Sequence, residues 1–145
     1  MKVLIQRVNS AKVVVEDQIV GAIQKGLLLY ICFEISDQEA NLDAAVSNLT
    51  HLRIFEDEKE RMHFSLQDTQ YEVLSVSQFT LSWDGSRGHR PSFDKSMPPN
   101  QARLMYALFN KKLRDHGISV SEGKFGANMQ VYSENDGPVT FFLSF

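Results

Sequence analysis

The stretch Gly26-Leu27-Leu28-Leu29-Tyr30-Ile31-Cys32-Phe33 is the longest strongly apolar run in this sequence, and it decides the kind of fold we expect. Its apolar residues follow one another without the alternation of a half-buried strand. Residues 27–33 therefore predict a central β-strand that is buried on both faces. The run is far too short to cross a bilayer as a helix, so we expect no membrane partner.

Further strands are expected on both sides of this run, where β-branched and aromatic residues are enriched and turn residues separate them. The N-terminal candidates are residues 3–8, 11–16 and 19–23, with turns at Asn9-Ser10 and near Asp17-Gln18. The C-terminal candidates are residues 52–55, 71–81, 118–120, 129–132 and 139–145.

Two helices are marked by their ends and by their apolar periodicity. Ser36-Asp37-Gln38-Glu39 matches a capping box at a helix start. The stripe that follows it consists of Leu42, Ala45, Val46 and Leu49. A second helix should start at Pro98-Pro99 and end at Gly117, with an inner face of Met105, Leu108, Phe109 and Leu113. Residues 1–145 are thus expected to form one β-rich α+β domain whose two helices cover one side.

Composition places the chain among ordinary globular proteins. Its 145 residues are 43% hydrophobic and 23% charged, and the N-terminus becomes polar too early for a signal peptide. The single cysteine, Cys32, excludes an internal disulfide and lies among large apolar residues, which favours a buried structural thiol over a nucleophile. We expect a soluble cytoplasmic protein.

The formal net charge of −3 argues against a general polyanion-binding surface, so any contact with RNA must come from a local basic patch. One candidate is Arg87-Gly88-His89-Arg90 together with Lys95, and the other is Lys111-Lys112-Leu113-Arg114. Taken alone, each segment is more typical of a solvated surface than of a binding site.

The usual signatures of catalysis are missing from the sequence. It has no nucleophile elbow, Walker loop, dinucleotide fingerprint or zinc-protease motif. The four histidines lack ligand spacing, and the acidic residues within 56–61 are sequential, which indicates a solvated turn. We therefore expect no metal and no cofactor. The long loop at residues 82–97 is of a length that is usually functional or disordered.

Two segments are unusual. Ser77-Gln78-Phe79-Thr80-Leu81 ends a strand with polar side chains, which either line a site or are satisfied hydroxyls at a sheet edge. Asn135-Asp136-Gly137-Pro138-Val139-Thr140-Phe141 has the composition of a turn that enters the last strand. A Gly-Pro pair has a further capacity, because an X–Pro bond tolerates the cis form and glycine leaves room for a close ligand.

Together these segments resemble the paired signatures of the D-aminoacyl-tRNA deacylase family, Ser-Gln-x-Thr-Leu and Asn-x-Gly-Pro-Val-Thr. The resemblance extends along the whole chain. It also covers Gln6-Arg7-Val8, Gly88-His89-Arg90-Pro91-Ser92-Phe93 and Gly123-Lys124-Phe125-Gly126-Ala127-Asn128-Met129-Gln130-Val131.

The resemblance implies a three-layer α/β/β fold and a homodimer with its active sites at the subunit interface. It implies a cis bond between Gly137 and Pro138, with the pair reaching into the partner's pocket beside Val139 and Thr140 of the same motif. There the carbonyl oxygens would hold the substrate's α-amino group and exclude an L side chain, and Arg7 would fix the pair's orientation. Glycyl-tRNA, which has no side chain to reject, should also be accepted.

The activity that the resemblance implies is hydrolysis of the ester in D-aminoacyl-tRNA, with no role for DNA. The candidate catalytic residues are Ser77, Gln78, Phe79 and Thr80. Either Thr80 is the nucleophile or the vicinal 2′-OH of the terminal adenosine assists, and we favour the second account because no base is evidently placed to activate Thr80. The candidate contacts to adenosine and tRNA are Phe125, which could stack on adenine, Gly126, Met129, Arg87 and Arg90. The alternatives are a non-enzymatic RNA-binding module and a related deacylase that acts on misattached L-amino acids.

Overall fold

The predicted central strand is β3 (Gly26–Cys32), and it lies inside a six-stranded sheet in the computed structural model, which describes residues 1–86 and 88–145. The sheet has the order β2-β1-β3-β6-β7, and β8 pairs with β1 beside this path. The other strands are β1 (Lys2–Val15), β2 (Gln18–Ile23), β6 (Glu72–Ser77), β7 (Val120–Glu122) and β8 (Gln130–Ser144). β3 runs antiparallel to β1 and parallel to β6, and six of its seven residues are buried, as the unbroken apolar run predicts.

The turn expected at Asn9-Ser10 is wrong, because β1 passes through these residues as one strand. The pairing of β1 with β8 shifts register twice between Gln6 and Ser10, which bends the strand without ending it. On the N-terminal side of the bend β1 places Ile5 in one core, and on the other side it places Val8 in a second core. The two final strands expected from the sequence are likewise joined into the single bent strand β8.

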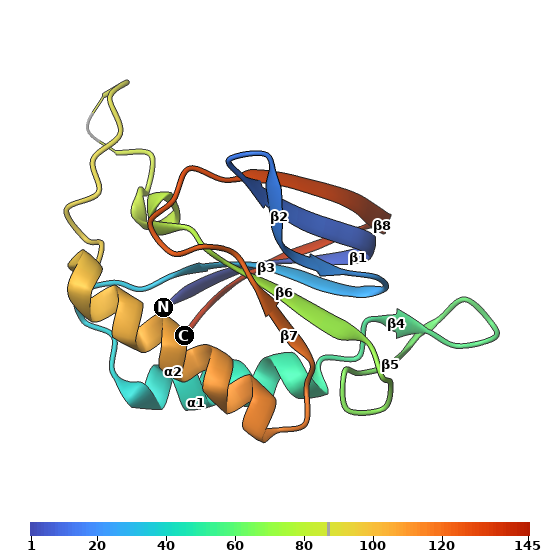
Figure 1. The fold of residues 1–145 in the computed structure, drawn as a ribbon. Helices are drawn as coiled ribbons and strands as arrows, with labels where there is room; N and C mark the ends of the chain where they lie inside the picture. Colours follow the sequence, from blue (N-terminus) through green and yellow to red (C-terminus); the bar gives the residue numbers. More distant parts are fainter. Residues whose placement is uncertain (87) are drawn as a thin grey trace.

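Helices α1 (Glu39–His51) and α2 (Pro99–Asp115) lie on the same side of the sheet, so the predicted α+β class is confirmed (Figure 1). The apolar stripe of α1 is buried throughout. Its predicted cap is wrong, since the helix begins at Glu39 and the capping box joins Gln38 to Asn41. Asp37 instead accepts hydrogen bonds from the Met1 ammonium group and from the backbone N–H of Glu34.

α2 follows the sequence prediction more closely. Pro99 stands at its first position, and Gly117 follows its C-cap with a φ of +81°, a left-handed conformation that favours glycine. Phe109 and Leu113 are buried as expected, and Tyr106 and Asn110 complete the buried face. Neither α2 nor α1, both within the described ranges, is long and apolar enough to cross a membrane.

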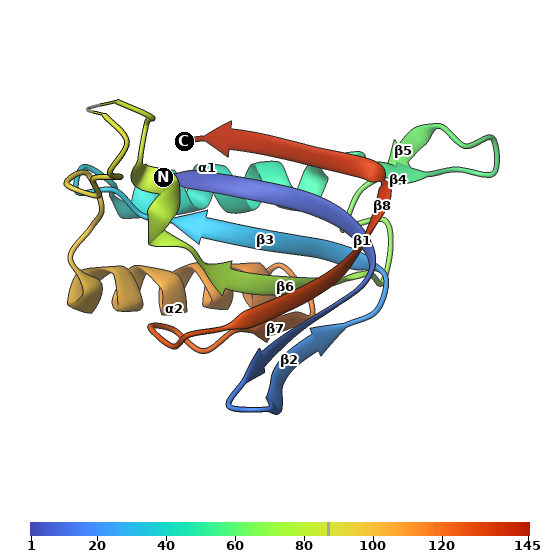
Figure 2. The same ribbon diagram turned by 90° about the horizontal axis from the view of Figure 1, so that it is seen from above.

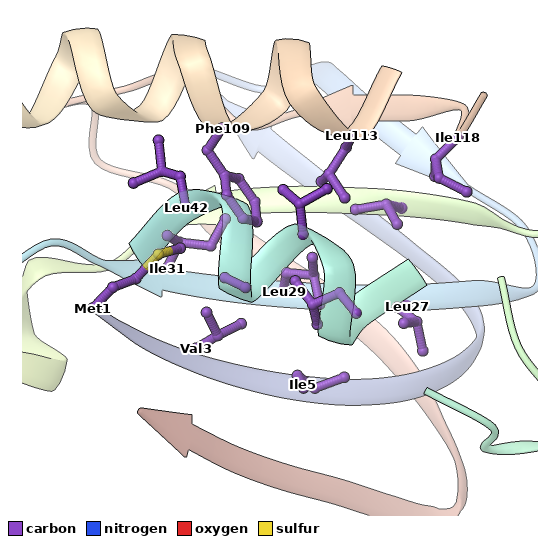
Figure 3. Close-up of a cluster of buried hydrophobic side chains, with 14 of the residues drawn as sticks. Met1, Val3, Ile5, Leu27, Leu29, Ile31, Leu42, Phe109, Leu113 and Ile118 are labelled. Atoms are coloured by element: carbon purple, nitrogen blue, oxygen red, sulfur yellow. The ribbon is translucent and has the colours of Figure 1, made fainter. Parts of the chain in front are cut away.

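Two apolar cores separate three layers (Figure 1). The helices form the first, and β3, β6 and β7 form the second together with the N-terminal half of β1 and the C-terminal half of β8. The third consists of β2 and the curled other halves of β1 and β8. The first core contains Leu42 from α1, Phe109 from α2 and Leu29 of β3, which lie between the helices and the sheet (Figure 3). The second core lies inside the curl and includes Val8 and Leu74.

The curl brings β2 against β7 although these strands are at opposite ends of the sheet order. Gly21 permits this approach, because a Cβ at this position would lie 2.4 Å from the backbone carbonyl oxygen of Glu122. Ser121 of β7 donates a hydrogen bond to the carbonyl oxygen of Ala22, at 2.9 Å.

Two further expectations are corrected. The strand expected over residues 71–81 ends at Ser77 and is followed by the short 3-10 helix η1 (Phe79–Ser82). The strand expected over residues 52–55 is reduced to β4 (Phe55–Glu56), which pairs with β5 (Met62–Phe64). The acidic segment between β4 and β5 is a turn, in which Asp57 accepts hydrogen bonds from the backbone N–H groups of Lys59 and Arg61.

Replacing Phe109 with Ala tests whether the first core stabilises the sheet. Phe109 is fully buried, so we expect Phe109→Ala to lower the free energy of unfolding by about 3–5 kcal/mol, measured by urea denaturation. The matched control is Leu104→Ala on the exposed side of the same helix, which should change stability by less than about 0.5 kcal/mol. Similar losses for the two variants would contradict the assignment of the core.

Candidate functional site

A cavity of about 600 Å³ opens at the carboxyl ends of the parallel strands β3 and β6. Strand ends contribute Ile31, Ser77 and Gln78, and η1 contributes Phe79. The start of α2 and the loop before β8 form the other walls. The described lining contains no charged side chain, and most of it is apolar. A space of this size and character suits a small, mostly neutral ligand with a few polar contacts.

The first predicted motif lies on one wall of this cavity. The backbone N–H of Gln78 donates to the carbonyl oxygen of Ile31 at 2.7 Å, which continues the sheet pairing one residue beyond β6. The chain then turns into η1, where the ring of Phe79 is 56% exposed and lies edge-on to Phe93, with ring centroids 5.0 Å apart. Ser77, Gln78 and Phe79 are therefore brought together at the cavity.

Thr80 lies on the exposed side of the same turn and is not part of the cavity lining. Its hydroxyl oxygen accepts a hydrogen bond from the side-chain amide of Gln78. An amide cannot remove the hydroxyl proton, and among the described residues no histidine or lysine is hydrogen-bonded to Thr80.

Two side chains, from β3 and β1, hold η1 in place by hydrogen bonds to its backbone. The Cys32 thiol donates to the carbonyl oxygen of Phe79 at 3.5 Å, and the Lys2 ammonium group donates to that of Leu81 at 3.2 Å. Burial, with the nearby carboxylate of Glu34, raises the pKa of Cys32 to about 11. The thiol is therefore protonated at neutral pH, which fits the predicted structural role.

The opposite wall contains the other predicted adenosine contacts, Phe125, Gly126 and Met129. The guanidinium carbon of Arg103 lies 4.8 Å from the ring centroid of Phe125. Sequence reasoning missed Arg103, because an arginine early in a helix carries no signal of the ring beside it. It also did not assign Phe93 to the site, although this residue lies in the loop that was singled out for its length and in one of the segments of the resemblance.

The second predicted motif forms an outward bulge in β8. Thr140 pairs with Gln6 and Asn135 pairs with Val8, so residues 136–139 of β8 stand opposite Arg7 alone. The side-chain amide of Asn135 closes the bulge by donating to the carbonyl oxygens of Arg7 and Val139, at 2.8 and 3.2 Å. The bond between Gly137 and Pro138, both exposed at the tip, is cis.

Arg7 fills the space beneath this bulge and is only 2% exposed. Its guanidinium group donates to the carbonyl oxygen of Ile54 at 2.7 Å and forms ion pairs with Glu56 and Asp136, at 2.8 and 3.0 Å. A Cβ on Gly137 would lie 3.1 Å from Arg7 and 2.7 Å from Val139. The φ of +117° at Gly137 also disfavours any other residue there.

The two motifs lie at opposite ends of the strands. Arg7 is level with Leu27, which is level with Val73, whereas Ser77 is four residues further along β6. This offset alone is about 13 Å at the usual rise of a strand. In Figure 2, β8 bends sharply near the β4–β5 hairpin, and η1 lies at the other end of the sheet. Within one chain, then, the bulge does not reach the cavity.

The described basic residues of the two predicted basic segments are exposed or already ion-paired. Arg87 lies outside the described residues, and Arg90 and His89 are exposed. Lys95 forms an ion pair with Asp84. The cations of the second segment are paired within the chain: Lys111 with Asp115, Lys112 with Glu39 and Asp43, and Arg114 with Glu122. This segment is a solvated surface and not a free cationic patch.

Comparisons with known proteins identify the same family over nearly the whole length of the chain. The family described as D-Tyr-tRNA(Tyr) deacylase matches residues 4–144. Proteins named D-aminoacyl-tRNA deacylase from Exiguobacterium sp. and from Thermotoga petrophila are each 46% identical over 143 residues. These matches cover 99% of this chain and 97% and 96% of the relatives.

Solved structures are similar as well. One is the c-Myc DNA Unwinding Element Binding Protein, with a TM-score of 0.94 and 39% identity, covering 100% of this chain and 99% of that one. Another is a probable eukaryotic D-amino acid tRNA deacylase, with a TM-score of 0.86 and 20% identity over 98% of this chain and 97% of that one, a likeness that supports the fold alone. With the match of the family over nearly every residue, the chain belongs to the D-Tyr-tRNA(Tyr) deacylase family.

Proposed function

We propose that this protein hydrolyses the ester bond between a D-amino acid and the terminal adenosine of tRNA, and that it rejects L-aminoacyl-tRNA. The observation that carries the proposal is the position of Ser77, Gln78 and Phe79 on the wall of an uncharged cavity, in a chain matched over its length by proteins named D-aminoacyl-tRNA deacylase. The cytoplasmic location suggested by the single cysteine remains a prediction.

The cavity would hold the terminal adenosine. Adenine would stack on the ring of Phe125, since aromatic stacking is the common way in which proteins hold an unpaired base. Gly126 and Met129 would complete the base site. The ester would then lie near Gln78 and the backbone of Phe79.

The chirality filter would come from a second copy of the chain. The exposed Gly137-Pro138 tip is well separated from the cavity of its own chain, which supports a site completed by the partner's bulge in a homodimer. Exposed apolar side chains on β8, Tyr132 at 50% and Phe142 at 52%, and on β2, Ile19 at 61%, support an interface on this side.

Selection by main-chain groups suits a substrate whose side chain varies. Carbonyl oxygens at the tip would hold the α-amino group, which every substrate shares, and the rigid bulge would exclude an L side chain. The buried guanidinium of Arg7, held by Asp136 and Glu56, would keep the tip in place.

For the chemistry, we favour assistance by the vicinal 2′-OH of adenosine over attack by Thr80. Thr80 is exposed, lies outside the cavity lining and is bonded to an amide that cannot act as a base. The neighbouring 2′-OH is held next to the ester by the substrate itself, which gives it a high effective concentration. Protein donors at the end of β6 would orient the carbonyl and stabilise its developing negative charge.

The protein name c-Myc DNA Unwinding Element Binding Protein raises DNA as a ligand for that relative. For this chain we propose no DNA partner. Its net charge is −3 and the cations near the end of α2 are paired with acids, whereas duplex binding depends on free cations that neutralise phosphates.

A deacylation assay with D-tyrosyl-tRNA, L-tyrosyl-tRNA and glycyl-tRNA tests the specificity. We expect hydrolysis of the D-ester and the glycyl ester, and at least a roughly hundredfold lower kcat/KM for the L-ester. Hydrolysis of none of them would favour a non-enzymatic RNA-binding module, and preference for the L-ester would favour a deacylase of misattached L-amino acids.

Thr80→Ala separates the two chemical accounts. We expect this variant to retain kcat within about threefold of wild type, whereas D-tyrosyl-tRNA ending in 2′-deoxyadenosine should react roughly a hundredfold more slowly with the wild-type protein. An inactive Thr80→Ala protein together with full activity on the 2′-deoxy substrate would overturn the 2′-OH account.

Mixing two variants tests whether the site is shared between chains. Gly137→Ala disturbs the bulge, and Gln78→Ala removes a side chain of the cavity, so each variant alone should lose most activity. In a mixed dimer one site combines an intact bulge with an intact cavity, and random pairing should restore about a quarter of wild-type activity. Sedimentation analysis would confirm the dimer, and no recovery in mixed dimers would place both parts of the site in one chain.

A further inference from the structure

Arg103 stands at the rim of the cavity with no described acidic partner. It lies on α2 next to Ala102, which lines the cavity, and its guanidinium group lies over the ring of Phe125. A Cβ on Gly126 would be 3.9 Å from one of its terminal nitrogens, so the group also rests against the loop that forms the cavity wall.

This pairing with a ring sets Arg103 apart from the other cations of its helix. Lys111, Lys112 and Arg114 are each ion-paired with carboxylates. Among the described residues, no carboxylate forms an ion pair with Arg103 and no hydrogen bond occupies its N–H groups. The aromatic ring orients the guanidinium plane but leaves its donors available.

The charge pattern of the site makes this position distinctive. The described cavity lining is uncharged and suits a nucleoside, and Arg103 supplies positive charge just outside it. Lys124, which is exposed and precedes Phe125, has no described ion pair either and adds charge of the same sign. In a chain with a net charge of −3, such local cations are needed to attract a polyanionic substrate.

We infer that Arg103 binds the phosphodiester attached to the 5′-oxygen of the terminal adenosine and so orients the 3′ end of the substrate. The inference rests on the proposed function, because it takes adenosine to be the occupant of the cavity. With the base against Phe125, a 5′-phosphate at this rim of the cavity would be within reach of the Arg103 guanidinium, which lies over the same ring. A planar guanidinium can donate two parallel hydrogen bonds to the phosphate oxygens.

Binding of adenosine and of adenosine 5′-monophosphate, measured by calorimetry, tests the phosphate contact without hydrolysis. The variant is Arg103→Met, which keeps an apolar cover on Phe125 and removes the charge. Wild type should bind the monophosphate about threefold to tenfold more tightly than adenosine, and the variant should bind both equally. Lys111→Met is the matched control, because it removes a paired, exposed cation from the same helix and should keep the preference.

Kinetics provide the second measurement. With D-tyrosyl-tRNA, Arg103→Met should raise KM by about threefold to tenfold and leave kcat unchanged, since the contact is the same in the ground state and the transition state. With D-tyrosyl-adenosine, which has no phosphate, the variant should match wild type. The slope of log(kcat/KM) against log[salt] should fall by about 0.7, the value for one phosphate contact on a single strand.

Two results would overturn the inference: wild type that does not distinguish the monophosphate from adenosine, or an equal loss on the phosphate-free and tRNA substrates. The second result would show that Arg103 acts only by packing on Phe125. If wild type hydrolyses no D-aminoacyl-tRNA, the proposed function fails. The comparison of adenosine with adenosine 5′-monophosphate still decides the role of Arg103.

Discussion

The buried guanidinium of Arg7 is the constraint on which the geometry of this protein depends. A charge with 2% exposure is stable only if its environment supplies compensating charge and acceptors. Glu56, Asp136 and the carbonyl oxygen of Ile54 do so, and they come from segments far apart in the sequence. One side chain therefore ties the bend of β1 to the bulge of β8 and to the hairpin beyond the first helix.

The two parts of the proposed site are supported by different kinds of contact. The second core, inside the curled sheet, includes Val76 and is contacted by Met129, which lie at the cavity. The bulge is held instead by polar contacts at the far end of the strands, where residues 136–139 face Arg7. The cavity holds its occupant largely with apolar groups, whereas the tip presents backbone. This division suits recognition of a constant nucleoside on one side and of the configuration of one carbon atom on the other.

The sequence predicted the elements with strong periodicity and missed the features that depend on distant partners. The apolar run of β3, the stripe of α1 and the ends of α2 are local signals, and all were confirmed. Asn9-Ser10 has turn residues but lies in a strand, because pairing with β8 outweighs its local preference. Likewise, Ser36 does not cap α1: the capping residue is Gln38, and Asp37 accepts a hydrogen bond from the N-terminal ammonium group. The site motifs were found through family resemblance, whereas the position of Arg103 over Phe125 is defined only by a contact across the fold.

The pairing of β1 with β8 also determines when this protein can fold. Residues from β1 are central to both cores, and β8 covers them from the opposite end of the chain, with Lys2 beside Ser144 and Val14 beside Gln130. Contacts of such sequence separation form late, because the entropy of closing the intervening loop must be overcome first. On the ribosome, β1 is synthesised first among these strands, and its partner β8 is synthesised last. During translation, the growing chain exposes the apolar edge and face of β1, and this interval is when it is most exposed to aggregation and to capture by chaperones.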